Sequence, residues 1–130
     1  MSLLLDTRTF IYLISEYQRV PPGVLARMES SSLVVSTLCL WEMLIKAGKG
    51  RLRVDTEGST LTDFWLGQCE ALELNILPID TADVRHLEQL PDFHKDPFDR
   101  LLICQAIEHG LAIVTPDSQI RGYPVKTLWD

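Results

Sequence analysis

In the stretch "HKDPFDRLLICQA", residues 94–106, two aspartates three positions apart precede an almost wholly apolar run, and their role determines how the chain is interpreted. The pattern predicts a helix start, with Asp96 as the N-cap and Pro97 at the first helical position, where its missing N–H costs nothing. Asp99 falls in the first turn, in a capping-box-like position, and both carboxylates favour the positive end of the helix dipole. Capping alone explains both aspartates, so any chemistry at Asp99 depends on the rest of the chain.

Short apolar runs alternate with helical patterns on both sides of this stretch. Strands are predicted at residues 2–6, 33–36, 75–80, 111–115 and, as a last short strand, within 123–129. Further helices are predicted within residues 7–17, 21–32, 37–50, 59–74 and 81–90. This alternation predicts βαβ units and a parallel sheet covered on both faces. We therefore expect an α/β fold, a three-layer α/β/α domain with a short, mostly parallel central sheet, spanning residues 1–130.

Composition narrows the class of protein. The 130 residues are 46% hydrophobic, yet no apolar run approaches the roughly 20 residues of a membrane span, and the N-terminus lacks the features of a signal peptide. We expect a soluble, cytoplasmic protein with no membrane partner. The three cysteines and three histidines show no metal-ligand spacing. The cysteines are therefore expected to be packing residues, and His86, His94 and His109 to lie on the surface or in loops.

Acidic residues gather where the predicted strands end. Asp6, Asp80 and Asp117 come at or next to the ends of three strands, and Glu42 lies in the second turn of the helix after residues 33–36. In open α/β sheets, ligands bind beyond these carboxyl ends. Glu42 sits in an apolar segment where a buried carboxylate needs a partner or a metal. The alternative is that it marks the wet side of its helix.

Carboxylates that converge on one pocket repel one another, and a divalent cation relieves that repulsion. The helix that begins at Asp96 would place Asp99 near the same sheet edge as Asp6 and Glu42. All-oxygen ligands suit Mg²⁺ or Mn²⁺ rather than zinc. The chemistry such a site supports is phosphoryl transfer, as in two-metal nucleases.

The net charge of −6 speaks against broad nucleic-acid binding, but the charge is uneven. The segment "KAGKGRLR", residues 46–53, carries Lys46, Lys49, Arg51 and Arg53 with no acid between them. A solvated basic loop and a local phosphate-binding patch both remain open readings of this segment.

Four motifs in order, "LLLDT", "LWEMLIKAGKGRL", "HKDPFDRLLICQA" and "LAIVTPD", resemble PIN-domain proteins over essentially the whole chain. More narrowly, they resemble the VapC-type toxin ribonucleases and their PilT N-terminus-like relatives. The resemblance implies four catalytic, metal-binding acids, namely Asp6, Glu42, Asp99 and Asp117. It also places Thr7 and Thr115 where the family often has a hydroxyl that orients water or metal, with local bonding to backbone as the alternative. Arg8 departs from a histidine common in close relatives.

The resemblance also implies an activity and partners. Such proteins cleave RNA with Mg²⁺ or Mn²⁺, are inhibited by a small cognate antitoxin, and often form homodimers. The basic residues 46–53, together with Arg100, would then hold the RNA backbone, because phosphate contacts position a strand without reading its sequence.

Two alternatives remain. A haloacid-dehalogenase-like phosphatase would use Asp6 as a nucleophile, but Arg8 stands where such enzymes place a second acid. A catalytically silent PIN-like binding module would be expected to have lost one or more of the four acids, and all four are present.

Overall fold

A single five-stranded sheet, with strand order β3-β2-β1-β4-β5, forms the centre of the computed structural model, which describes residues 2–130. Every neighbouring pair of strands is parallel, so the predicted mostly parallel sheet is parallel throughout. The strands are β1 Ser2–Leu5, β2 Ser32–Ser36, β3 Asn75–Leu77, β4 Ala112–Val114 and β5 Thr127–Leu128. Each of the five predicted strand segments contains a strand.

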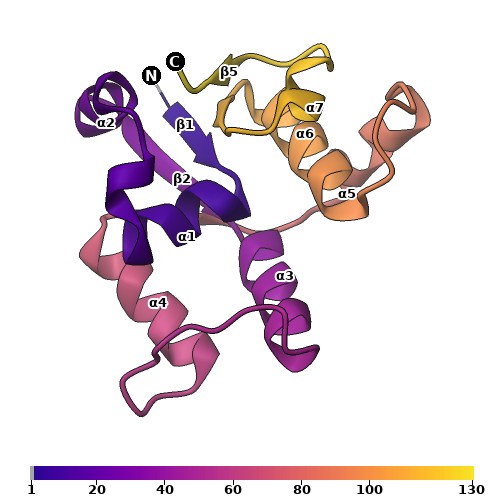
Figure 1. Cartoon of the computed structure of the whole chain (residues 1–130). Helices are drawn as coiled ribbons and strands as arrows, with labels where there is room; N and C mark the ends of the chain where they lie inside the picture. The colour runs from indigo at the N-terminus through magenta and orange to yellow at the C-terminus, as the bar shows by residue number, and fades with distance from the viewer. Residues whose placement is uncertain (1) are drawn as a thin grey trace.

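Helices connect the strands and cover the sheet on both faces. They are α1 Thr7–Ser15, α2 Pro22–Glu29, α3 Thr37–Gly48, α4 Leu61–Ala71, α5 Thr81–Val84, α6 Pro97–His109 and α7 Ser118–Arg121, with 3₁₀ turns η1 Tyr17–Arg19 and η2 Arg85–Glu88. Figure 1 shows α1, α2 and α4 on one side of β1 and β2, and α5, α6 and α7 on the other. Within residues 2–130, no helix is long and apolar enough to span a bilayer.

Two predicted elements are shorter than expected. The strand predicted at residues 75–80 ends at Leu77, because Pro78 has no N–H to continue the ladder. Asp80 is consequently not a strand-end acid but the N-cap of α5, in a capping box with Asp83. The helix predicted at 81–90 forms one α-helical turn and then tightens into η2, a common way for a helix to end.

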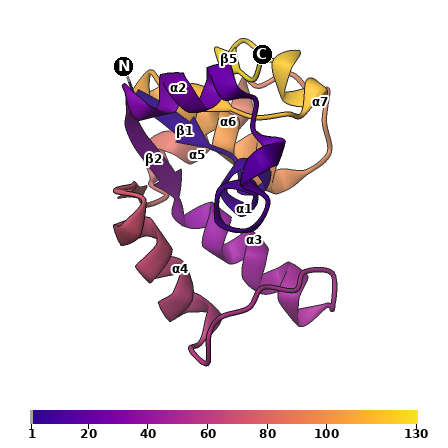
Figure 2. The same cartoon turned by 60° about the vertical axis from the view of Figure 1, so that its left-hand side comes forward.

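The core lies on both sides of β1, whose three leucines are fully buried. Successive side chains of a strand point to opposite faces. Leu3 and Leu5 therefore pack in the apolar cluster that includes residues of α1, α2 and α4, whereas Leu4 packs with α6 and α7. Figure 2 shows α1 and α3 side by side near the end of β1, and the two helices are in contact. This alternation accounts for the three layers.

The strand order creates one crevice at the carboxyl edge of the sheet. The chain runs outward from β1 through β2 to β3, and then returns to place β4 on the other side of β1. A reversal of this kind separates the loops after the two central strands and opens a crevice between them. Whatever follows β1 and β4 is therefore brought to the same place.

The stretch quoted first forms the predicted helix start. The Asp96 carboxylate accepts hydrogen bonds from the backbone N–H groups of Phe98 (2.9 Å) and Asp99 (3.3 Å), and Pro97 is the first residue of α6. The helix ends at Gly110, whose left-handed φ of 65° suits glycine. The capping role predicted for Asp96 is confirmed.

Removing the Asp96 cap should lower stability. We expect Asp96→Ala to reduce the free energy of unfolding by about 1 kcal/mol, because two N–H groups lose their acceptor. Asp96→Asn removes the same charge but keeps an acceptor oxygen, so it should stay within a few tenths of a kcal/mol of wild type. Urea denaturation of the three proteins measures the difference, and equal stability of the Ala and Asn variants would contradict the capping role.

Candidate metal centre at the carboxyl edge of the sheet

A pocket of about 270 Å³ opens at this edge, and all four predicted acids line it. Its lining residues are Asp6, Thr7, Arg8, Ile11, Glu42, Lys46, His94, Asp96, Asp99 and Asp117. They come from the segments after β1 and β4, from α1 and α3, and from the start of α6. Residues more than 100 positions apart in the chain thus meet in one pocket.

Asp6 directly follows β1 and is almost fully buried, with 5% of its surface exposed. One carboxylate oxygen caps α1 by accepting from the Thr9 N–H (2.8 Å), and the other accepts from the Thr115 hydroxyl (2.5 Å). Burial raises the pKa of Asp6 above its ordinary value, and the hydrogen bonds from Thr115 and Thr9 oppose that rise. Thr115 also accepts from the Asp117 N–H (3.0 Å), so it links two of the acids.

Glu42 is 7% exposed, which excludes its assignment to the wet side of α3. The Thr7 hydroxyl donates to one of its oxygens (2.5 Å), and the Lys46 ammonium lies 2.8 Å from the other. Thr7 and Thr115, the two hydroxyl positions suggested by the family pattern, thus each bind a site carboxylate. The partner and the ion pair that a buried glutamate requires are both present.

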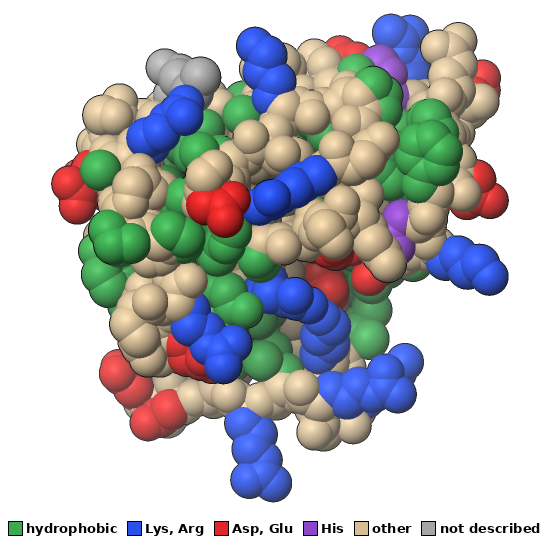
Figure 3. All heavy atoms as spheres, turned by 45° about the horizontal axis from the view of Figure 1, so that its top comes forward, with side chains coloured by type: hydrophobic (Ala, Val, Ile, Leu, Met, Phe, Trp, Pro, Cys, Tyr) green, Lys and Arg blue, Asp and Glu red, His purple; other side chains and the backbone are tan. Residues whose placement is uncertain are grey.

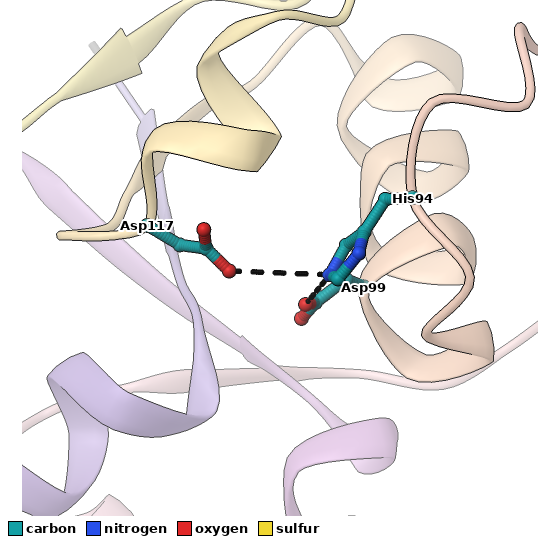
Figure 4. A group of neighbouring side chains, drawn as sticks. All are labelled: His94, Asp99 and Asp117. Carbon is teal, nitrogen blue, oxygen red and sulfur yellow. Dashed lines mark hydrogen bonds and ion pairs between the residues drawn. The ribbon is translucent and has the colours of Figure 1, made fainter.

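Asp99 does not complete the expected capping box, because its carboxylate faces the imidazole of His94 at 2.8 Å. Burial, reinforced by the negative charge of Asp96, raises the pKa of Asp99 to about 6, and the hydrogen bond from His94 opposes this rise. Asp117, which caps α7, has an oxygen 4.0 Å from the same imidazole nitrogen. Figure 4 shows the three side chains turned toward one another.

One donor atom from each of His94, Asp99 and Asp117 lies within 4.8 Å of the others. Asp6 and Glu42 line the same pocket but are not members of this close cluster. The sequence predicted a surface or loop position for His94, and His94 does lie in the loop before α6. Its contact with the acids was not predicted. The only signal was its position five residues before Asp99, across a helix start, which is not a ligand spacing of any common metal motif.

This donor set fits a divalent cation. Carboxylate oxygens dominate it, and burial raises the pKa of both Asp6 and Asp99, so ionised carboxylates in this pocket lack full compensation by protein groups. A bound cation of charge +2 provides that compensation. The carboxylates positioned to hold it are those of Asp99 and Asp117, with Asp6 and Glu42 lining the same pocket.

Basic side chains surround an adjoining hollow that shares Glu42, Lys46 and Asp96 with the acid pocket. Its other charged residues are Lys49, Arg51 and Lys95. Figure 3 shows Lys and Arg side chains around a recess in which acidic side chains are visible, with a histidine near its rim. Lys95 was missed from the sequence because its loop is distant in the chain from residues 46–53.

Two of the predicted RNA contacts lie elsewhere. Arg53 lines a separate depression with Leu52 and Val54. The Arg100 guanidinium donates to the carbonyl of Pro91 (2.9 Å) and to the Tyr123 hydroxyl (3.3 Å), and it does not line the acid pocket. The structure therefore brings Lys46, Lys49 and Arg51 to the site, but not Arg53 or Arg100.

Comparison with solved structures supports the same fold. VapBC2 from Rickettsia felis, bound to a promoter DNA fragment, contains a chain that matches with a TM-score of 0.68 at 18% identity, over 100% of both chains. DNA-bound VapBC from Salmonella typhimurium matches with a TM-score of 0.67 at 21% sequence identity, over 98% of this chain and 97% of that one. VapBC-1 from nontypeable Haemophilus influenzae matches with a TM-score of 0.63 at 18% sequence identity, over 98% of this chain and 97% of that one.

Comparison at the level of sequence assigns the family. No curated protein matches the sequence significantly. The family model of the PIN domain, however, matches residues 3–126, nearly the whole chain. With the parallel sheet and the acids gathered at its carboxyl edge, this match shows that the chain belongs to the PIN domain family.

Proposed function

We propose that this protein is a divalent-metal-dependent endoribonuclease that hydrolyses RNA phosphodiester bonds, and that it is the toxin of a VapBC-type toxin–antitoxin pair. The observation that carries the proposal is the convergence of Asp6, Glu42, Asp99 and Asp117 on one pocket beside a basic hollow. Such a hydrolase needs acidic side chains that bind metal and basic side chains that bind phosphate.

Each side chain has a role that follows from its contacts. When bound, Mg²⁺ or Mn²⁺ supplies positive charge that activates water and stabilises the phosphate oxygens. Asp99 and Asp117 would hold the cation, and Asp6 and Glu42 complete the acidic wall of the pocket. Thr115 and Thr7 orient Asp6 and Glu42 by donating to one oxygen of each, which leaves their remaining lone pairs available to the pocket.

The basic hollow provides the RNA contacts. Lys46, Lys49, Arg51 and Lys95 border the acid pocket and would bind phosphates on either side of the bond that is cut. Because Lys46 is paired with Glu42, it also connects the RNA-binding side chains to the metal-binding wall.

The proposed partner is a small cognate antitoxin, and the proposed state is a homodimer in the cytoplasm. Several similar solved structures are VapBC or toxin–antitoxin complexes, two of them bound to DNA. Exposed apolar side chains beside the site, Trp41 and Phe93 among them, offer a surface that a protein partner would cover.

Cleavage of RNA tests the proposal. Wild type should cut RNA only with Mg²⁺ or Mn²⁺, and Asp6→Asn and Asp99→Asn should each lower the rate by about a hundredfold or more, since even residues that only support metal ligands contribute about 10–100-fold. Asp80→Asn is the matched control, because Asp80 is exposed, caps α5 and lies outside the pocket. Gel-resolved cleavage rates with and without EDTA provide the measurement.

Cleavage that persists in EDTA, or full activity in both pocket variants, would contradict this mechanism. The phosphatase alternative predicts a different result, namely a trappable phosphate on Asp6 and turnover of small phosphate esters. We expect neither, because both Asp6 oxygens already accept hydrogen bonds and Arg8 is exposed at the position of the second acid.

The pH dependence of stability provides a further prediction. In the metal-free protein burial raises the pKa of Asp99 to about 6, above the ordinary value of an aspartate carboxyl group, so the folded state binds the proton more tightly than the unfolded state. The contribution of Asp99 to the free energy of unfolding should therefore rise as the pH falls from about 7 to about 4, by about 1–3 kcal/mol. Asp99→Asn should be more stable than wild type at pH 7 without metal, and should lose that advantage near pH 4.

Saturating Mn²⁺ should raise the melting temperature of wild type at pH 7 and should do so less at pH 5, where protons compete for the carboxylates. Differential scanning fluorimetry of both proteins at each pH measures these shifts. An unchanged melting temperature with Mn²⁺ at pH 7 would count against a metal site.

A further inference from the structure

We infer that His94 is a nitrogen ligand of the cation in this pocket and that it makes the site select Mn²⁺ over Mg²⁺. The inference rests on the proposed metal site but not on RNA cleavage. It assigns a role to His94, which is not one of the four predicted acids.

The first support is the direction of the imidazole. His94 Nε2 lies 2.8 Å from an Asp99 oxygen and 4.0 Å from an Asp117 oxygen, and the three donor atoms lie within 4.8 Å of one another. Figure 4 shows His94 approaching from the loop before α6 while Asp117 approaches from the opposite side. Three atoms that can each bind a metal therefore converge from two separate segments of the chain.

The second support is that the backbone holds this loop in place. The N–H groups of Phe93 and His94 both donate to the hydroxyl of Tyr123, at 3.0 and 2.8 Å, and Tyr123 is buried. Arg100 donates to the same hydroxyl and to the Pro91 carbonyl. The His94 side chain is only 17% exposed, whereas its neighbour Phe93 is 66% exposed. Tyr123 and Arg100 thus act as positioning residues that aim the imidazole into the pocket.

The third support is ligand chemistry. Mg²⁺ is bound almost entirely through oxygen ligands and gives up its bound water molecules reluctantly. Imidazole, in contrast, binds first-row transition ions readily. Carboxylates suit Mg²⁺ and Mn²⁺ alike, so they do not distinguish the two ions. One imidazole among several carboxylates therefore favours Mn²⁺. In that state Nε2 gives its lone pair to the cation and the ring proton stays on Nδ1.

Pulsed EPR on the full-length protein loaded with Mn²⁺ tests the inference directly. Wild type should show electron spin echo modulation from a histidine nitrogen, and the modulation should change when the histidines are labelled with ¹⁵N. His94→Gln should lose this signal, because an amide is a poor metal ligand. The glutamine amide can still donate a hydrogen bond to Asp99, so the variant removes the ligand and keeps that contact. His86→Gln is the matched control, since His86 pairs with Glu108 outside the pocket and should leave the signal unchanged.

Calorimetric titration with each ion supplies a second readout. The preference of wild type for Mn²⁺ over Mg²⁺ should fall by about tenfold in His94→Gln, and Tyr123→Phe should reduce it partially by releasing the loop. If His94 only orients Asp99, His94→Gln should keep the wild-type preference, and that result would overturn the inference. Bound Mn²⁺ without histidine modulation, or no binding of Mn²⁺, would also overturn it.

These results separate the inference from the proposed function. A His94-dependent nitrogen signal in a protein that cleaves no RNA would support the ligand assignment and reject the nuclease. Metal-dependent RNA cleavage with an unchanged ion preference in His94→Gln would support the nuclease and reject the ligand assignment.

Discussion

Burial of several carboxylates at one edge of the sheet, reinforced at Asp99 by the negative charges of Asp96 and Glu42, is the constraint that shapes this site. The fold gives three of the four acids a compensating group. Thr9 and Thr115 donate to Asp6, Thr7 and Lys46 compensate Glu42, and His94 binds Asp99. These contacts hold the acids in place but do not neutralise the pocket, because burial still raises the pKa of Asp6 and Asp99. A divalent cation would compensate the remaining negative charge.

Several residues that line the acid pocket also cap helices. Asp6 caps α1, Asp96 caps α6 and Asp117 caps α7, so three helix starts point their N–H groups at one crevice. A helix N-terminus stabilises a nearby negative charge, and acids placed there lower the energy of the helix while facing the pocket. Asp6 and Asp117 therefore each combine a helix-capping contact with a place in the wall of the acid pocket. At α6 the two roles are divided, with Asp96 on the backbone and Asp99 toward His94.

The sequence predicted what depends on short-range pattern and chain order. Apolar runs that end at acids located β1 and β4, and the parallel order of the strands then brought Asp6 and Asp117 together. Long-range side-chain contacts were not predictable in this way. The Tyr123 hydroxyl that holds the His94 loop lies 29 residues away, and no periodicity encodes that contact. Arg100 was expected near the acids because it follows Asp99 in sequence, but its guanidinium donates to the Pro91 carbonyl and the Tyr123 hydroxyl and does not line the acid pocket.

We propose that the acids bind a divalent cation at the carboxyl edge of the sheet. Crystals grown with Mn²⁺ and measured near the manganese absorption edge test it most directly, because anomalous scattering locates the ion without assumptions about its ligands. We expect an anomalous peak inside the pocket, within bonding distance of oxygens of Asp99 and Asp117. A pocket without such a peak at saturating Mn²⁺, or a peak only at a surface site away from these acids, would contradict it.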